Sequence, residues 1–297
     1  MPNKHAYLII AHHQFELLQV LIEMLDDERN DLFVHIDSKV QNFDFDKFKA
    51  IPKHSNIYFT DRVSVAWGDF SVVQCEMILF RVAVERQSDS NHYSYFHLIS
   101  GVDLPIKSSS EIYNFFESNY PKEFIHFTND EPLKEFENRI RYYHVFRKKR
   151  NTVNKLIAQV ALKAQKLVGV NRLKGSNLVV QKGSQWVSIT DKFAEYLVSN
   201  EEFIEKTFNY SYCSDEVFLQ TMFVNSEFKD NVYMKNQNNN QLAAARLIDW
   251  DRGNPYVFKS DDFDEIINSP AMFARKFDLN VDKDVIYKIK DYIMGKE

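Results

Sequence analysis

The first 128 residues alternate short apolar runs with longer amphipathic runs. This alternation limits the possible folds of the chain more strongly than any other feature of the sequence. The apolar runs predict strands and the amphipathic runs predict helices. Strands that alternate with helices form a mostly parallel sheet covered on both faces. The expected strands are 6–11, 31–37, 56–61, 93–100 and 123–128, and the expected helices are 14–25, 70–87 and 109–119.

The second half continues with looser spacing and no internal repeat or Gly/Ser linker, which favours one domain with a C-terminal extension. Its expected helices are 147–167, 191–199, 201–208, 215–225 and 282–294, and its strand-like runs are 177–190 and 243–250.

Polar residues follow several predicted strands, at the sheet edge where open α/β folds bind ligands. The expected first strand, 6–11, includes Ile10 near its end and is followed by His12, and the second strand ends at Asp37. The strand at 93–100 is followed by Gly101 and Asp103, so Ser100, Gly101 and Asp103 are expected to approach the others.

His12 and His13 are adjacent, so on a strand they would point to opposite sides and would not serve one metal ion together. A hydrogen bond from His12 to a ligand, or a satisfied histidine at the sheet edge, fits better. Asp37 suits a ribose hydroxyl, or else it caps the residues that follow it.

The seven glycines form neither a dinucleotide fingerprint nor a phosphate-binding loop. The Asp-x-Asp pairs at Asp44/Asp46, Asp249/Asp251 and Asp282/Asp284 are also expected by chance in so acidic a chain, so they do not establish a metal site. A bound diphosphate would then be held by cations. Arg246, Arg252, Arg275 and Lys276 lie in a C-terminal region rich in acids, and they either neutralise a departing diphosphate or pair with Asp249, Asp262 or Asp264.

The stretch "SYCSDEVFLQTMF" places Asp215 and Glu216 where a helix is expected to begin. Ser214 and the two acids fit an N-cap with an acidic first turn. Local spacing alone does not distinguish that role from a general base.

Basic residues are concentrated from Asn138 to Thr190, where twelve Lys or Arg occur without one Asp or Glu. The rest of the chain holds 25 basic and 42 acidic residues. The segregation indicates an anionic partner, or a solvated basic helix with none. Leu156, Val160 and Leu167 can share one side of a helix beside Lys155, Lys163 and Lys166, so this side is expected on an anionic membrane or packed in the core. The alternative from another class is a non-catalytic protein that uses this segment to bind nucleic acid or a membrane, although no nucleic-acid reader module is present and the whole chain is acidic.

Only Cys75 and Cys213 are present, so neither a disulfide framework nor a zinc spacing is expected. The N-terminal apolar run is too brief for a signal peptide or a membrane span. Both features favour a cytoplasmic protein.

Seven stretches in order resemble glycosyltransferase family 14, which comprises the core-2/I-branching β-1,6-N-acetylglucosaminyltransferases and the peptide O-xylosyltransferases. The stretches are "AHHQFELLQVLI…FVHIDSK", "VAWGDFSVVQCEMIL", "YFHLISGVDLPIKSSSEI", "GSQWVSIT", "SDEVFLQT", "RLIDWDRGNP" and "FARKFD".

The resemblance implies a GT-A-type, Rossmann-like domain over residues 1–297, with a nucleotide-binding half (1–128) and an acceptor- and diphosphate-binding half (129–297). It implies an inverting transfer of GlcNAc or xylose from a UDP-sugar, with no cofactor and no metal. The residues that match the family's site are Glu216 as catalytic base, Arg246 and Lys276 at the diphosphate, Ile10, His12 and Asp37 at the uridine, and Ser100, Gly101, Asp103, Gln185, Trp186 and Asp215 around the sugar and acceptor.

The chain departs from the animal members in having no recognisable anchor and only two cysteines. This favours a bacterial, cytoplasmic enzyme, peripheral at the inner face of the cell membrane, with a glycan or lipid-linked saccharide as acceptor. The segment 147–174 has little counterpart in the matched motifs and is the expected membrane contact; nucleic acid is not an expected partner.

Overall fold

Alternating side chains of the first strand enter two separate hydrophobic cores in the computed structural model, which describes residues 3–128, 133–148 and 151–296. On strand β1 (Lys4–Ala11), Tyr7 and Ile9 join one core, whereas Ala6 and Leu8 join the other. Successive side chains of a strand point to opposite faces, so this sheet is buried on both sides.

The main sheet has the order β3-β2-β1-β4-β6. Its first four members, β1, β2 (Asn30–Ile36), β3 (Asn56–Phe59) and β4 (Tyr93–Ser100), pair in parallel. Strand β6 (Ser188–Thr190) pairs antiparallel with β4. The carboxyl ends of the parallel strands therefore lie along one edge, which we call the carboxyl edge.

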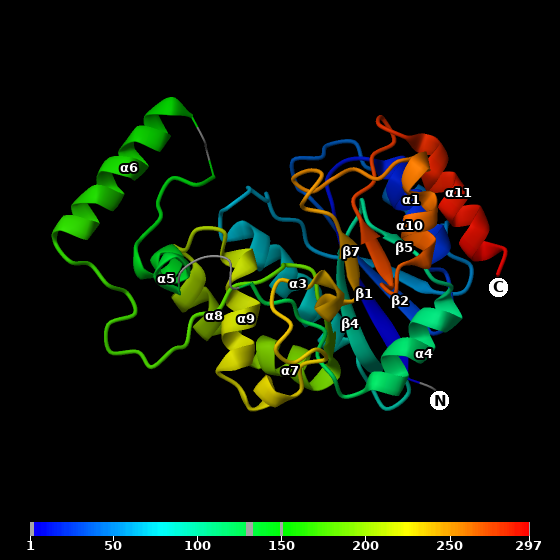
Figure 1. The fold of residues 1–297 in the computed structure, drawn as a ribbon, viewed down its shortest axis with the longest axis horizontal. Coiled ribbons are helices and arrows are strands. Elements are labelled where there is room, and N and C mark those ends of the chain that lie inside the picture. The colour runs from blue at the N-terminus through cyan, green and yellow to red at the C-terminus, as the bar shows by residue number, and fades with distance from the viewer. Residues whose placement is uncertain (1–2, 129–132, 149–150, 297) are drawn as a thin grey trace.

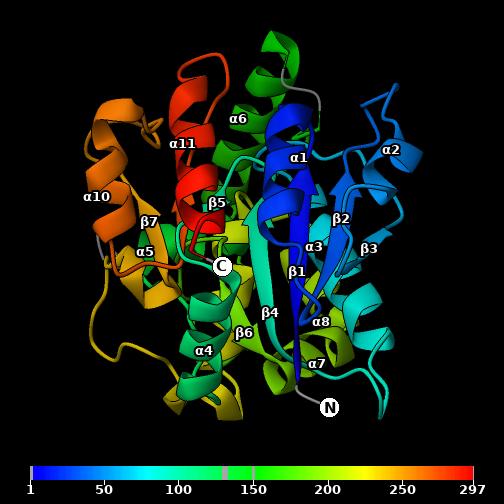
Figure 2. The same cartoon turned by 90° about the vertical axis from the view of Figure 1, so that its right-hand side faces the viewer.

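Helices cover both faces of this sheet (Figure 2). One core includes residues of α1 (Phe15–Met24), α4 (Ser109–Asn119) and α11 (Lys283–Met294). The other includes residues of α3 (Ser71–Glu85), α7 (Asp191–Ser199), α8 (Glu201–Phe208) and α9 (Phe218–Val224). The α/β class and the mostly parallel sheet predicted from the sequence are confirmed.

A second, three-stranded sheet has the order β5-β8-β7. It consists of β5 (Leu104–Pro105), β7 (Arg246–Ile248) and β8 (Phe273–Arg275), and α10 (Phe263–Asn268) lies beside it in Figure 1. Because β5 follows β4 after three residues, this sheet brings the C-terminal strands close to the carboxyl edge.

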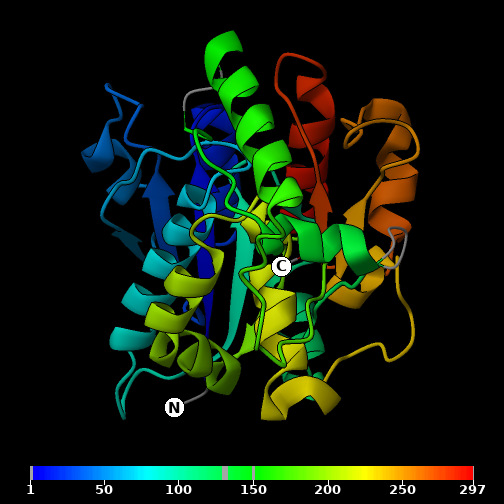
Figure 3. The same cartoon turned by 90° about the vertical axis from the view of Figure 1, so that its left-hand side faces the viewer.

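The remaining helices are α2 (Phe45–Lys49), α5 (Leu133–Arg141), α6 (Thr152–Leu167) and the short 3-10 helices η1 (Ser214–Glu216), η2 (Glu227–Asp230), η3 (Gln241–Ala244) and η4 (Ser260–Asp262). Figure 1 shows α6 standing apart from the rest of the molecule, and Figure 3 views the molecule from the side on which α6 lies. In the described part of the chain, no helix is both long enough and apolar enough to span a membrane.

The prediction of a strand at 123–128 is wrong. Only single bridges form there, from Glu123 to Val232 and from Phe124 to Ser188. The Glu123 carboxylate accepts hydrogen bonds from the Thr190 amide and hydroxyl, so this segment is attached by a side chain as well as by its backbone. The strand-like runs 177–190 and 243–250 shrink to β6 and β7.

Candidate active site

The three residues expected at the uridine lie at the carboxyl edge. Ile10 is the penultimate residue of β1, and its carbonyl accepts a hydrogen bond from the amide of Gly101 (2.9 Å). Asp37 directly follows β2, where its amide donates to the Ala11 carbonyl (3.1 Å). The Asp37 carboxylate also accepts from the Lys39 amide (2.8 Å), which is the capping role left open above. The donor-binding role stays a prediction.

The expectation that His12 and His13 point to opposite sides is wrong. Their rings are stacked with centroids 4.1 Å apart, because β1 ends at Ala11 and both residues lie in the bend that follows. Burial lowers the pKa of both imidazoles, and the proximity of His13 lowers that of His12 further. The pair therefore favours the neutral form near pH 7.

A second part of the site is built around Arg275. Its Nη1 donates to Oδ1 of Asp103 (2.7 Å), and its guanidinium lies 4.5 Å from the centre of the Trp186 ring. The other Asp103 oxygen accepts from the Ser100 amide (2.9 Å). Burial raises the pKa of Asp103, while Arg275 opposes the rise. Ser100, Asp103 and Trp186, predicted separately, are thus linked to one another through Arg275 and the Ser100 amide.

Arg246 is held inside the protein by hydrogen bonds. Only 1 % of the residue is exposed, and its guanidinium donates to the carbonyls of Ala244 (2.6 Å) and Val187 (2.9 Å) and to the hydroxyl of Ser188 (3.1 Å). These bonds tie β7 to the β6 segment of the main sheet. The Nη donors of Arg246 are thus bonded within the protein, and its role at a diphosphate stays a prediction.

The other C-terminal cations divide between two roles. Arg252 forms ion pairs with Asp249, Asp262 and Glu265, so the structural alternative is correct for it. Lys276 follows Arg275 at the end of β8 and is partly exposed. The charges of Lys276 and Arg275 both act on His13, so these two cations lie near the carboxyl edge.

The candidate base Glu216 ends the 3-10 helix η1. Its side chain is 39 % exposed, and Oε2 accepts a hydrogen bond from Nη1 of Arg139 (2.7 Å). Nζ of Lys182 lies 3.9 Å from the same oxygen. Two cations from other segments therefore hold a carboxylate that solvent can still reach.

Asp215 lies in a different environment. Its Oδ1 is sealed from solvent and has no hydrogen-bond partner among the described residues. Burial, aided by the charge of Glu216, raises the pKa of Asp215 to about 7. The expected N-cap is wrong, because Cys213 precedes η1 in the left-handed conformation (φ 46°) and the Ser214 hydroxyl is buried without a partner in the described structure.

Glu76 on α3 is fully buried, and it lies close enough to Asp215 for their charges to interact. Its Oε1 accepts a hydrogen bond from Nε2 of Gln185 (2.6 Å), and its Oε2 has no partner in the described structure. Burial raises the pKa of Glu76 well above its ordinary range, and Asp215 adds to the rise. We call Glu76, Asp215 and Glu216 the carboxylate cluster.

Gln185 and Trp186 join the two parts of the site. Gln185 contacts the carboxylate cluster through Glu76, and the next residue, Trp186, lies against Arg275. A continuous series of residues thus runs from an exposed carboxylate to a cation and on to the carboxyl edge. This arrangement can accept a proton at one end and stabilise a developing negative charge at the other.

The Asp-x-Asp pairs have structural roles. Asp44 and Asp282 accept hydrogen bonds from the first turns of α2 and α11, and Asp249 accepts from the Asp251 and Arg252 amides. Within the residues that the structure describes, no group of three or more His, Cys, Asp or Glu side chains is placed to hold a metal ion.

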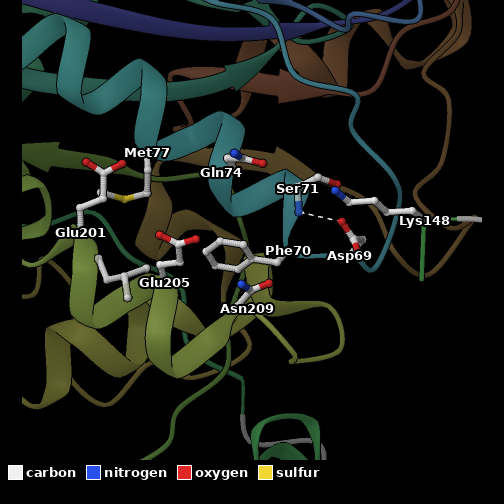
Figure 4. A pocket seen from close by; sticks show the side chains of 10 residues that line it. Asp69, Phe70, Ser71, Gln74, Met77, Lys148, Glu201, Glu205 and Asn209 are labelled. Carbon is white, nitrogen blue, oxygen red and sulfur yellow. Dashed lines mark hydrogen bonds between the residues drawn. The ribbon is translucent and has the colours of Figure 1, made fainter. Parts of the chain in front are cut away.

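Two hollows lie outside this series of residues. The first, of about 280 Å³, lies between the start of α3 and helix α8 and is lined by Ser71, Glu201 and Glu205 among others (Figure 4). It contains none of the predicted site residues. The second, of about 350 Å³, touches Arg246, but the guanidinium of that residue is already bonded to the interior. We therefore place the site by its side-chain chemistry and by the carboxyl edge.

The sequence did not predict Glu76, Arg139 or Lys182 as residues of the site. Arg139 and Lys182 belong to the acid-free segment, which placed them near an anion but did not identify Glu216 as that anion. Glu76 is surrounded by apolar residues of α3, which was the available signal for a buried acid.

Comparison with known proteins agrees with the resemblance. Xylosyltransferase sqv-6 of Caenorhabditis elegans is 26 % identical over 86 % of this chain and 32 % of its own length. Human Xylosyltransferase 2 is 22 % identical over 99 % of this chain and 34 % of its own. The chain therefore spans about a third of these relatives.

A mouse structure, Xyloside xylosyltransferase 1 in its apo form, covers 92 % of this chain and 97 % of its own with 9 % identity and a TM-score of 0.38. The sequence model of the family described as "Core-2/I-Branching enzyme" matches residues 5–266, which is most of the chain. The chain therefore belongs to the Core-2/I-branching enzyme family.

Proposed function

We propose that the chain is an inverting glycosyltransferase that moves GlcNAc or xylose from a UDP-sugar to a hydroxyl of a glycan or other acceptor, without a metal ion. Membership in the Core-2/I-branching family supports transfer of a sugar. The names of the curated relatives, which are xylosyltransferases, support xylose as one of the two donor sugars.

The observation that carries the proposal is the different exposure of two adjacent carboxylates. Glu216 is open to solvent and held by Arg139 and Lys182, whereas Oδ1 of Asp215 is sealed from solvent. A general base has to reach the acceptor hydroxyl within hydrogen-bonding distance. Glu216 can do so, and a base of this kind contributes roughly 10² to 10⁴ to the rate.

The proposed transfer is a single displacement. Oε of Glu216 takes the proton of the acceptor hydroxyl while that oxygen bonds to the anomeric carbon. The bond from this carbon to the UDP oxygen breaks with its electron pair, so UDP leaves from the opposite face and the configuration inverts. The new negative charge on the diphosphate is stabilised by Arg275 and Lys276, the cations at the end of β8.

Asp103 and Trp186 hold Arg275 in position through an ion pair and a ring contact, so the cation is ordered before the donor arrives. A charge that is already in position costs no free energy of reorganisation when the transition state forms, so such contacts raise the rate. Ile10, His12 and Asp37 at the carboxyl edge are the proposed uridine contacts.

We also propose action in the cytoplasm, at the inner face of the cell membrane, with a glycan or lipid-linked saccharide as acceptor. The two cysteines are both buried as free thiols, which agrees with a reducing compartment.

The test is release of UDP from UDP-GlcNAc and UDP-xylose, with and without EDTA. Glu216→Gln should lower turnover roughly 10²-fold or more and leave donor affinity nearly unchanged. Glu227→Gln, at an exposed glutamate of η2, is the matched control and should keep full turnover. Loss of all turnover in EDTA would disprove the metal-free transfer, and a folded Glu216→Gln protein with normal turnover would remove Glu216 as base.

A further inference from the structure

Helix α6 differs from the other long helices because none of its residues is buried. Figure 1 shows it projecting from the body of the protein. Gln165 attaches it to the segment after α5, since its side chain accepts from the amide of Tyr143 (2.8 Å) and donates to the carbonyl of the same residue (2.9 Å). The helix is thus fixed along one side and open along the other.

The open side of α6 is apolar. At 100° per residue, its five exposed large apolar side chains fall within an arc of about 100°. Leu162 and Gln165, on the other side, are partly covered by the protein. The expectation that the apolar side packs in the core is therefore wrong. The exposed apolar residues are Val153 (64 %), Leu156 (61 %), Ile157 (43 %), Val160 (59 %) and Leu167 (87 %).

One lysine borders this apolar arc. Lys163 lies at its edge, whereas Lys166 and Lys155 lie about 80° and 100° beyond that edge on the same flank of the helix; all three are exposed. The acid-free segment from 138 to 190 includes the whole helix, so no carboxylate within it competes for these lysines. Lys149 and Arg150, which precede α6, lie outside the described residues.

We propose that the open side of α6 docks on the surface of an anionic lipid membrane. Leu156 and Val160 would enter the boundary between headgroups and acyl chains, while Lys163 would contact lipid phosphates and Lys155 would add to the attraction from farther round the helix. An amphipathic helix with a basic flank binds in the plane of such an interface. Nucleic acid offers phosphates but no apolar layer for a continuous apolar arc, so the composition of the face favours lipid.

The binding is separate from the transfer reaction, because no residue of α6 belongs to the carboxylate cluster or the carboxyl edge. The site could lose all activity while the membrane contact remained, and the reverse also holds. The experiment therefore measures binding alone.

The test is co-sedimentation of the full chain with vesicles of phosphatidylcholine, with and without phosphatidylglycerol, at low and high salt. We expect binding to the anionic vesicles that weakens as salt rises. The Leu156→Ser/Val160→Ser variant should bind about 10-fold more weakly, whereas Val281→Ser, at an exposed valine before α11, should bind like the parent.

Charge is tested in the same assay. Lys155→Glu/Lys163→Glu should weaken binding to anionic vesicles about 10-fold or more, with Lys229→Glu on η2 as the control. These side chains are exposed, so circular dichroism should show an unchanged fold. The proposal is overturned if the parent does not bind anionic vesicles at low salt, if the α6 variants bind as well as the parent, or if duplex DNA displaces the protein from the vesicles.

Discussion

Replacing Asp215 by asparagine should stabilise the protein, by an amount that grows with pH. Burial and the charge of Glu216 raise the pKa of this carboxyl from 3.8 to about 7. In the unfolded chain the group ionises at its ordinary value, so between these two pH values the folded state binds more protons. The contribution of Asp215 to the unfolding free energy is therefore fully present below pH 3.8 and is lost as the pH rises toward about 7.

The size of the effect follows from the same difference in pKa. One pKa unit corresponds to about 1.4 kcal/mol, so a rise of about three units costs about 4 kcal/mol of unfolding free energy once the pH exceeds 7. Asparagine does not ionise and carries no such cost. The variant should thus gain about 4 kcal/mol at pH 8 and only about 1 to 2 kcal/mol near pH 5.

Urea unfolding of both proteins at pH values from about 5 to about 8 measures this gain directly. Asp46→Asn is the matched control, because that side chain is 95 % exposed, so the change should alter the unfolding free energy only a little. If the gain of Asp215→Asn is the same at both ends of the range, or if the variant is less stable at pH 8, burial of the charge is not the cause. A stabilised variant that transfers sugar more slowly would show that the buried acid is kept for function.

Three other changes test different parts of the structure. Arg246→Met should lower the unfolding free energy by about 2 to 4 kcal/mol, because interior carbonyls lose their donor, while the folded variant keeps its affinity for the donor sugar nucleotide in calorimetry. Gly101→Ala should cost about 1 to 3 kcal/mol in urea unfolding, because a Cβ there would lie 2.9 Å from that of Ala11. Burial lowers the pKa of His35 from 6.5 to about 4. The contribution of His35 to the unfolding free energy is therefore present above pH 6.5 and falls by about 3 kcal/mol as the pH drops to 4. In the His35→Gln variant, the unfolding free energy should change less with pH over that range.

The carboxyl edge could be predicted because strand ends are set by local patterns. The predicted 93–100 strand matches β4 residue for residue, and the helices at 109–119, 191–199 and 201–208 match α4, α7 and α8 in the same way. Once the strands are parallel, the residues that follow them must share one edge. Ser100 and Asp103 therefore fell into the site without any knowledge of tertiary contacts.

The C-terminal cations could not be assigned in this way. Strands β7 and β8 have three residues each, and a shift of one residue would turn every side chain to the other face. In the observed register Arg246 pairs with Phe273 and packs on its ring at 4.5 Å, while Arg275 reaches Asp103. The register of so short a pair depends on packing against the main sheet, which no local pattern records.

The different surroundings of Asp215 and Glu216 also depend on a break in the expected helix, which local helix propensity did not predict. The sequence predicts one α-helix over 215–225, which would place successive side chains 100° apart on a first turn open to solvent. The chain instead forms η1, a 3-10 helix with about 120° between successive residues, after a left-handed Cys213, and α9 begins only at Phe218. This geometry turns one acid toward Glu76 and leaves the next with Arg139. The broken helix thus gives two neighbouring carboxylates different surroundings, and it leaves Glu216, the proposed base, partly exposed beside Arg139.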